Sequence, residues 1–354
     1  MSSRVATISG GPNVIVWDIT YACPLRCTHC YSESGRRASR QLSLVDMLRV
    51  TEAMLSLHPA AIVLAGGEPL VVKGLQEVVD CMVDGGVETH LYTGGWSVRR
   101  SVVEDVLAKC AGVSVSVDGA TAEVHDAVRG RVGSFDRAMA TLALLDRWAV
   151  RQRARHAKPC TFALDATIVR SSFGQLELFC TDIVPRFPEL HQLSFGAAMP
   201  IGLASRSGFA EHELLTDEQA DLLVDIKHIE WLRSLVPPSV HISVTDNRLL
   251  RYHPDLLAQG RIPAMQVEPD GRVRAMAIYE GTVGSLLTDP PMDLWKRSVA
   301  RWSDPFVIET LSSVYTMKDW AAATRRLDYR FGTDDDRARI DARPPALPQA
   351  LPAG

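Results

Sequence analysis

The feature that most constrains the fold is a regular alternation of short apolar segments with helix-like segments over residues 14–195. The segment 61–65 is apolar throughout, which is typical of a strand buried on both faces of a parallel sheet. Strands that alternate with helices favour right-handed βαβ units and a parallel sheet. We expect six strands, at 14–20, 61–65, 89–93, 113–117, 161–169 and 190–195, and five intervening helices, at 44–55, 75–83, 98–109, 135–150 and 176–183.

The second feature is a group of three cysteines within eight residues, directly after the first predicted strand, in the spacing Cys23-x3-Cys27-x2-Cys30. A four-iron cluster takes four ligands, so three cysteines would leave one iron open. The spacing lacks the fourth cysteine of a ferredoxin run and the paired ligands of a zinc site. His29 could be a fourth ligand, but its place between Thr28 and Cys30 predicts a ring that points away from the metal. Three buried structural cysteines are the alternative.

At these cysteines the chain resembles the radical S-adenosylmethionine (radical SAM) enzymes, whose signature is this spacing with an aromatic residue or His before the third cysteine. Further motifs match, in order, the subgroup that carries a C-terminal SPASM or twitch extension: Gly66-Gly67-Glu68-Pro69, Ser116-Val117-Asp118-Gly119, His125-Asp126 and Arg129-Gly130. The match covers about residues 14–205, with a weaker echo to about 297. It implies an α/β fold, a partial (β/α)6 barrel of the TIM type, with the motifs at the C-terminal ends of the strands.

The resemblance also implies the cofactors. One [4Fe-4S] cluster would be held by Cys23, Cys27 and Cys30, and its open iron would bind the amino and carboxylate groups of S-adenosylmethionine (SAM). An electron from an external reductant such as flavodoxin or ferredoxin would then cleave SAM to a 5′-deoxyadenosyl radical, which abstracts hydrogen from the substrate. The protein would orient the cofactor and exclude water.

Seven residues match family positions around SAM: Tyr31, Gly66, Gly67, Glu68, Ser116, Asp118 and Arg129. The family places the methionine amino group at the Gly-Gly strand end, the ribose and carboxylate at Ser116 and Arg129, and the adenine near Tyr31. Most of these residues have a plainer alternative. The glycines could form a turn, Arg129 could be a solvated helix-end residue, Asp118 could be a turn residue, and Tyr31 could be structural.

The C-terminal part follows the rhythm of the extension but lacks its cysteines. A hairpin is expected around Pro269-Asp270-Gly271, where the family has cysteines for auxiliary clusters, yet no cysteine follows Cys180. We expect an extension that keeps its fold without clusters, with one long helix at 217–235, a strand at 240–244 and helices at 290–299 and 305–314. The predicted divisions are a lead-in at 1–13, the barrel at 14–205, the α+β extension at 206–332 and a flexible tail at 333–354.

The bulk composition excludes some partners. With 46% hydrophobic and 23% charged residues and a net charge of −4, nothing indicates binding to nucleic acid. The sequence has no long uncharged apolar run for a membrane span and no apolar signal peptide. We therefore expect a cytoplasmic protein, in which clustered cysteines favour metal over disulfides. The remaining cysteines, Cys81, Cys110, Cys160 and Cys180, are predicted to pack in the core or on helices, and none to donate hydrogen.

These features lead to a prediction of function. Without auxiliary clusters a substrate radical lacks its obvious electron acceptor, so we expect fragmentation (decarboxylation or elimination) or rearrangement. The predicted substrate is a small sugar, nucleoside or aminocyclitol of an antibiotic pathway, walled by Tyr92, Thr93, Trp96 and Met199. The alternatives are a peptide maturase, a sugar dehydrogenase or epimerase, and a non-catalytic cluster- or SAM-binding regulator. The short N-terminus and the missing clusters argue against the maturase.

Overall fold

Ten strands form one sheet in the computed structural model, which describes residues 10–155, 161–258 and 264–346. They are β1 Val14–Thr20, β2 Ala61–Gly66, β3 Glu88–Thr93, β4 Gly112–Ser116, β5 Thr161–Ile168, β6 Gln192–Ala197, β7 His241–Thr245, β8 Met265–Val267, β9 Arg272–Arg274 and β10 Thr282–Ser285. Their order is β10-β9-β8-β1-β2-β3-β4-β5-β6-β7. The strands from β8 through β1 to β7 are parallel to their neighbours, whereas β8, β9 and β10 pair antiparallel.

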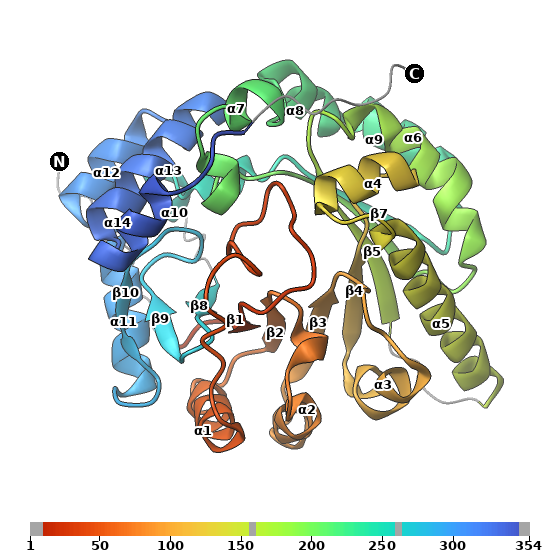
Figure 1. Cartoon of the computed structure of the whole chain (residues 1–354), viewed down its shortest axis with the longest axis horizontal. Helices are drawn as coiled ribbons and strands as arrows, with labels where there is room; N and C mark the ends of the chain where they lie inside the picture. The colour runs from red at the N-terminus through yellow and green to blue at the C-terminus, as the bar shows by residue number, and fades with distance from the viewer. Residues whose placement is uncertain (1–9, 156–160, 259–263, 347–354) are drawn as a thin grey trace.

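Helices follow most of the strands. Their bounds are α1 Leu44–Leu55, α2 Leu75–Asp84, α3 Arg100–Asp105, α4 Ala122–Arg129, α5 Ser134–Ala154, α6 Leu176–Leu178, α7 Phe209–His212, α8 Asp217–Leu223, α9 Ile226–Ser234, α10 Pro254–Ala258, α11 Pro291–Arg301, α12 Pro305–Ser312, α13 Met317–Phe331 and α14 Asp334–Asp341. Figure 1 shows α1, α2, α3 and α5 outside the curved sheet and the loop after β1 across its inner side. Among the described residues, no helix is long and apolar enough to cross a membrane.

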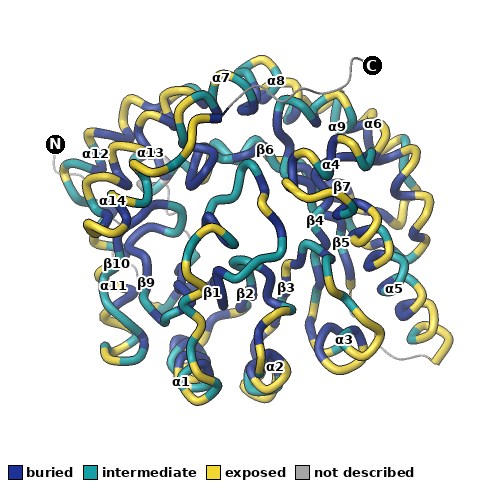
Figure 2. The backbone as a smooth tube through the Cα atoms, viewed as in Figure 1, coloured by how far each residue is buried: buried dark blue, intermediate teal, exposed yellow. Residues whose placement is uncertain are grey.

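The two faces of the curved sheet differ in burial. In β4, β5 and β6, buried residues alternate with partly exposed ones. The buried set, such as Leu164 and Ile168 at 0% exposure, packs under the outer helices. These helices in turn expose residues on the side away from the sheet (Figure 2). The partly exposed set faces the inner side, so the lumen of the partial barrel is lined by residues that the core does not cover.

The predicted α/β partial barrel is confirmed, and all six predicted strands are present within one or two residues of their expected ends. The strand expected at 240–244 is also present as β7, which extends the parallel sheet by one strand beyond the six units. The predicted hairpin is formed by β8 and β9. It joins the edge of the barrel at β1, so the sheet is continuous from the barrel into the C-terminal extension. The division at 205/206 stays a prediction.

Several predicted helices differ in the structure. The segment 98–109 is α-helical only over α3 and ends in a 3-10 turn at Leu107–Lys109, and 176–183 passes from α6 into a π-helical turn at Phe179–Ile183. The long helix at 217–235 is two helices, because the Asp225 side chain accepts a hydrogen bond from His228 N and starts α9 anew. The prediction missed α4 and α13 altogether.

The predicted flexible tail at 333–354 is wrong for its described part. Thr333 and Asp336 form a capping box that starts α14. The acidic first turn of this helix suits the positive end of the helix dipole. The charged residues that suggested a mobile tail are largely used in ion pairs, two of which reach the loop that carries the cysteines.

Candidate functional site

The three cysteines lie in residues 21–43, which join β1 to α1 and form no helix or strand. We call residues 21–40 the cluster loop. Its backbone is held by its neighbours: Arg26 N donates to Arg129 O at 3.0 Å, Thr28 N donates to Val128 O at 2.8 Å, and Cys30 O accepts from Leu203 N at 3.0 Å. Helix α4 and the segment after β6 therefore fix the loop from two sides.

The chemistry of the thiols fits a cationic ligand. Burial, with a smaller contribution from the neighbouring thiols, raises the pKa of Cys23 to about 12 and that of Cys27 to about 11. A bound metal centre lowers the pKa of such thiols, because a thiol that coordinates a metal is deprotonated. Among the described residues, no group of three or more Cys, His, Asp or Glu side chains lies close enough together to hold a single metal ion. A cluster binds each thiolate to a different iron and so spreads its ligands more widely than one ion.

Gly66 and Gly67 allow the end of β2 to approach the strand that leads into the cysteines. Gly66 has φ +110°, and a Cβ there would lie 2.6 Å from Thr20 O. A Cβ on Gly67 would lie 2.2 Å from Ala22 O. Gly67 N donates instead to Thr20 O at 2.7 Å, and Glu68 N donates to Ala22 O at 2.9 Å. These contacts give the two glycines a role in placing Cys23, in addition to any contact with a ligand.

The Glu68 carboxylate is buried and accepts hydrogen bonds from three donors. It accepts hydrogen bonds from Thr93 Oγ1 at 2.8 Å, Gly94 N at 2.9 Å and Leu70 N at 3.3 Å. Burial raises the pKa of Glu68, and the donors oppose that increase. Glu68 thus ties the end of β2 to the end of β3.

Asp118 is the centre of a buried polar network below the cluster loop. One oxygen, Oδ1, accepts from Arg129 Nη2 and from Thr167 N, both at 2.9 Å, and Oδ2 lies 2.8 Å from His29 Nε2. Burial raises the pKa of Asp118, but the charges of Arg129 and His29 lower it by more. The pKa therefore lies well below its usual value. The ring of His29 is therefore turned to Asp118, a contact that the sequence did not predict.

Arg129 connects this network to the cysteines, because its Nη1 lies 3.6 Å from Cys27 Sγ. Its Nε approaches Asp118 Oδ2 to 2.6 Å but makes no aligned hydrogen bond. The guanidinium is buried, so the solvated alternative for Arg129 does not hold. His125 lies behind the pair, and its Nδ1 accepts from Asp118 N at 3.1 Å. Burial and the Arg129 charge lower the pKa of His125 to about 4.

The two other predicted SAM residues lie on different sides of the lumen. Ser116 ends β4 and is partly exposed on the inner face. The hydroxyl of Tyr31 donates to Asp18 Oδ1 on β1 at 2.6 Å. The other oxygen of that carboxylate, Asp18 Oδ2, is buried without a hydrogen-bond partner among the described residues. Burial raises the pKa of Asp18 to about 6.

The structure separates the four residues predicted to wall the substrate. Tyr92 lies on the inner face of β3 with 38% exposure, hydrogen-bonded to Ser114. Thr93 does not face the lumen, because it is only 2% exposed. Its hydroxyl donates to Glu68 Oε1 and accepts from Gly95 N. Trp96 contacts Arg131 and Arg137, whose guanidinium carbons are 3.7 and 4.2 Å from its ring centroid. Met199 is half-buried and packs against the core after β6.

Sequence reasoning missed Asp165, in the middle of β5. It sits on the inner face beside Ser116 of β4 and Ser194 of β6 in the sheet register. Within the described chain its carboxylate makes no hydrogen bond or ion pair, although it lies near Tyr92, Asp118 and Arg129. Burial raises the pKa of Asp165 to about 6, and the Asp118 charge contributes. The available signal was a single acidic residue in an otherwise apolar strand, 161–169.

The comparisons with known proteins agree with this site. The radical SAM superfamily model matches residues 17–147, which hold the cysteines, both glycines and the Asp118–Arg129 pair. Residues 17–147 therefore form a radical SAM domain, and the relatives support the SPASM-like subgroup. Enzymes of this superfamily use a [4Fe-4S] cluster and SAM, and these are the cofactors of the site.

Three relatives show which kinds of radical SAM protein the chain is similar to. Mycofactocin maturase MftC of Mycobacterium ulcerans (strain Agy99) is 34% identical over 169 residues, which cover 48% of this chain and 43% of that protein. Sporulation killing factor maturation protein SkfB of Bacillus subtilis (strain 168) is 33% identical over 129 residues, covering 36% of this chain and 31% of that protein. AdoMet-dependent heme synthase of Methanosarcina barkeri (strain Fusaro / DSM 804) is 33% identical over 142 residues, covering 39% and 40%. The matches span less than half the length of these relatives.

Solved structures show the same fold. SuiB of Streptococcus suis bound to S-adenosylmethionine superposes with a TM-score of 0.63 at 15% identity, covering 86% of this chain and 68% of that chain. The enzyme anSMEcpe with bound AdoMet and the Kp18Cys peptide gives a TM-score of 0.56 at 12% identity, covering 93% and 98%. At these identities the likeness concerns the fold alone.

The comparisons overturn the predicted substrate. A small sugar, nucleoside or aminocyclitol is wrong as the main prediction, because the similar proteins include the maturases MftC and SkfB and the subtilosin biosynthesis protein AlbA. They lend no support to a decarboxylase or lyase. These similarities favour the alternative of a peptide maturase, against which the missing auxiliary clusters had argued.

Proposed function

We propose that the protein is a radical SAM enzyme that modifies a peptide. The observation that carries this proposal is the similarity of the chain to MftC, at 34% identity over 169 residues. A structure of SuiB bound to the precursor peptide SuiA has the same fold, with a TM-score of 0.61. An external reductant of the flavodoxin or ferredoxin type would supply the electron.

The residues of the site have distinct proposed roles. Cys23, Cys27 and Cys30 hold the cluster, and Ser116 and Arg129 contact the ribose and carboxylate of SAM. The Gly66-Gly67 strand end receives its amino group. When bound, these cofactors supply the radical that takes hydrogen from an unactivated C–H bond. Asp118 keeps the Arg129 guanidinium in place beside Cys27 through their buried ion pair.

The substrate would enter the lumen on the side of β3 to β6. Tyr92, Ser194 and the unpaired Asp165 carboxylate offer acceptors for amide, hydroxyl or ammonium donors of a peptide segment. A carboxylate without a cationic partner repels anionic substrates. The lumen thus disfavours a tetrapyrrole with its propionate groups, which similarity to the heme synthase would otherwise suggest.

The test is an anaerobic assay of the reconstituted, reduced protein with SAM. The probes are synthetic peptides whose sequences are encoded by short reading frames beside its gene. Fe-coproporphyrin III, a tetrapyrrole, is the probe for the competing substrate class. We expect a peptide to stimulate 5′-deoxyadenosine formation and to change in mass, and a protein with all three loop cysteines replaced by Ala to do neither. Stimulation by Fe-coproporphyrin III with every peptide unchanged would refute the proposal.

A further inference from the structure

The cluster loop has an anchor at the far end of the chain. Glu33 lies three residues after Cys30, is 4% exposed, and has a left-handed backbone with φ +54°. This conformation is uncommon for a residue other than glycine, so neighbouring contacts must hold it. Its carboxylate oxygen Oε1 accepts from Arg343 Nη2 at 2.6 Å and Nε at 3.2 Å, and from Arg339 Nη1.

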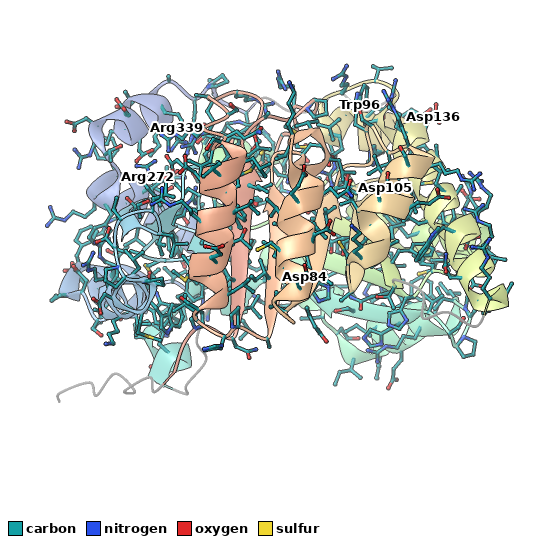
Figure 3. The ribbon with its side chains drawn as sticks, turned by 90° about the horizontal axis from the view of Figure 1, so that it is seen from below. Asp84, Trp96, Asp105, Asp136, Arg272 and Arg339 are labelled. Atoms are coloured by element: carbon teal, nitrogen blue, oxygen red, sulfur yellow. The ribbon has the colours of Figure 1, made fainter. Side chains whose placement is uncertain are left out.

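Both arginines are themselves fixed by further contacts. Arg339 Nη2 donates to Glu280 Oε1 at 2.7 Å and to Asp336 Oδ1 at 3.1 Å. The side chains of Arg343 and Glu33 are only 4% and 5% exposed, so solvent screens this pair weakly. Arg339 lies at the same edge of the molecule as Trp96, whereas Asp84 at the end of α2 marks the other edge (Figure 3). The network is therefore at the C-terminal ends of the strands.

A second path joins the same helix region to the cysteines. Arg343 Nη1 donates to Ser205 Oγ at 3.0 Å, and Arg325 Nη1 of α13 donates to Ser205 O at 2.9 Å. Ser205 ends the short helical turn Gly202–Ser205, from which Leu203 N donates to Cys30 O. Arg206, the next residue, donates to Thr28 O at 2.6 Å. The C-terminal helices thus support, through the turn at Gly202–Ser205 and Arg206, the carbonyls of Thr28 and Cys30.

We propose that Arg339 and Arg343 are positioning residues for the iron–sulfur cluster. The cluster loop has no hydrogen-bonded helix or sheet of its own, so its thiolates are placed by these distant contacts. Groups outside the ligand shell orient metal ligands and tune the metal, and hydrogen bonding and solvent exposure set the potential of an iron–sulfur centre. The segment that follows the cysteine-free extension then has a function: Arg339 and Arg343 hold the loop that binds the cluster.

This inference rests on the cluster and not on the peptide substrate, so its test needs no substrate. The full chain is reconstituted anaerobically as wild type, Arg343→Ala, Arg339→Ala/Arg343→Ala and Arg343→Lys. Arg337→Ala is the matched control, because Arg337 lies on the same helix but is paired with the exposed Asp334. Iron loss to a chelator, the midpoint potential and the EPR spectrum of the reduced cluster are measured, together with urea unfolding of the cluster-free proteins.

We expect the double variant to lose iron about ten-fold faster than wild type, as outer-shell changes commonly weaken metal sites 10- to 100-fold. Its potential and EPR spectrum should shift. Arg343→Lys should depart from wild type less than Arg343→Ala does, and Arg337→Ala should behave as wild type. If the double variant unfolds earlier without its cluster but keeps wild-type iron loss, potential and spectrum, the arginines stabilise only the fold and the proposal is wrong. Neither result depends on whether a peptide is modified.

Discussion

Asp118 and Arg129 form a buried ion pair whose Oδ2 and Nε atoms lie 2.6 Å apart, directly beneath the Cys27 thiol. The two residues end consecutive elements, since Asp118 follows β4 and Arg129 closes α4. The same α4 turn accepts two backbone hydrogen bonds from the cluster loop. One buried pair therefore connects the sheet, the helix and the loop that carries the cysteines.

Removing Asp118 should weaken the whole fold. An Asp118→Ala substitution leaves the buried Arg129 charge without its partner, so we expect the free energy of unfolding to fall by about 3 kcal/mol. Urea unfolding of the cluster-free protein measures this directly. Asp289→Ala is the control, since its ion pair with Arg297 is partly exposed and solvent-exposed pairs contribute little to stability. Equal losses in both variants would contradict the central role of Asp118.

The glycine pair gives a prediction of its own. A Gly67→Ala methyl would meet Ala22 O at 2.2 Å, and backbone on both sides must move to admit it. We expect a loss of about 2 kcal/mol in unfolding free energy, as for an overpacked site, and less iron per reconstituted chain because Cys23 follows Ala22. Gly174→Ala, where nothing lies within 4 Å, is the matched control. Full iron content in Gly67→Ala would show that this contact does not place the cysteine.

The cluster content is also predictable. Reconstituted protein should hold about four iron atoms per chain, and a Cys23/Cys27/Cys30→Ala variant almost none. Iron and sulfide analysis provides the count. About eight irons, with four retained in the variant, would mean that another cysteine binds a second cluster. Of the remaining cysteines, Cys110 and Cys180 are buried among apolar residues, Cys81 lies on α2, and Cys160 is outside the described residues.

The sequence contained enough to predict the barrel and the motifs around the cysteines, because those features are local. Buried strands read as apolar runs, and Gly66-Gly67 and Asp118 directly follow such runs. The anchor of the cluster loop could not be predicted in this way. Glu33 and Arg339 are 306 positions apart, and a charged, proline-rich C-terminus is equally typical of a solvated tail.

Asp165 shows a second limit of the sequence. Its strand reads as buried, but period-two alternation alone does not say which face is the lumen. The structure decides this, because Leu164 and Ile168 pack outward and Asp165 must then point inward. The substrate class could not be predicted either, since missing auxiliary clusters alter the chemistry available without naming the molecule that binds.

The unpaired carboxylate of Asp165 should be costly to the fold, as expected for a group kept for binding. Its pKa is raised from 3.8 to about 6 by burial, so between these values the folded state binds more protons than the unfolded state. The contribution of Asp165 to stability is therefore highest below about pH 4, falls as the pH rises through 6, and stays reduced above it. Asp165→Asn removes this loss and should stabilise the protein at pH 7.5 by roughly 1–3 kcal/mol, with no gain at pH 4.

Urea unfolding of cluster-free wild type and Asp165→Asn at pH 4 and pH 7.5 gives the difference. Asp18 titrates over the same range in both proteins, so comparing them isolates Asp165. Glu230→Gln, at an exposed carboxylate on α9, should change stability little at either pH. A destabilised Asp165→Asn at pH 7.5 would mean that the carboxylate has a partner in the folded chain. In that case the lumen would lose its one free anionic acceptor on β5, and the proposed contact with a peptide donor would have to be made by Tyr92 or Ser194.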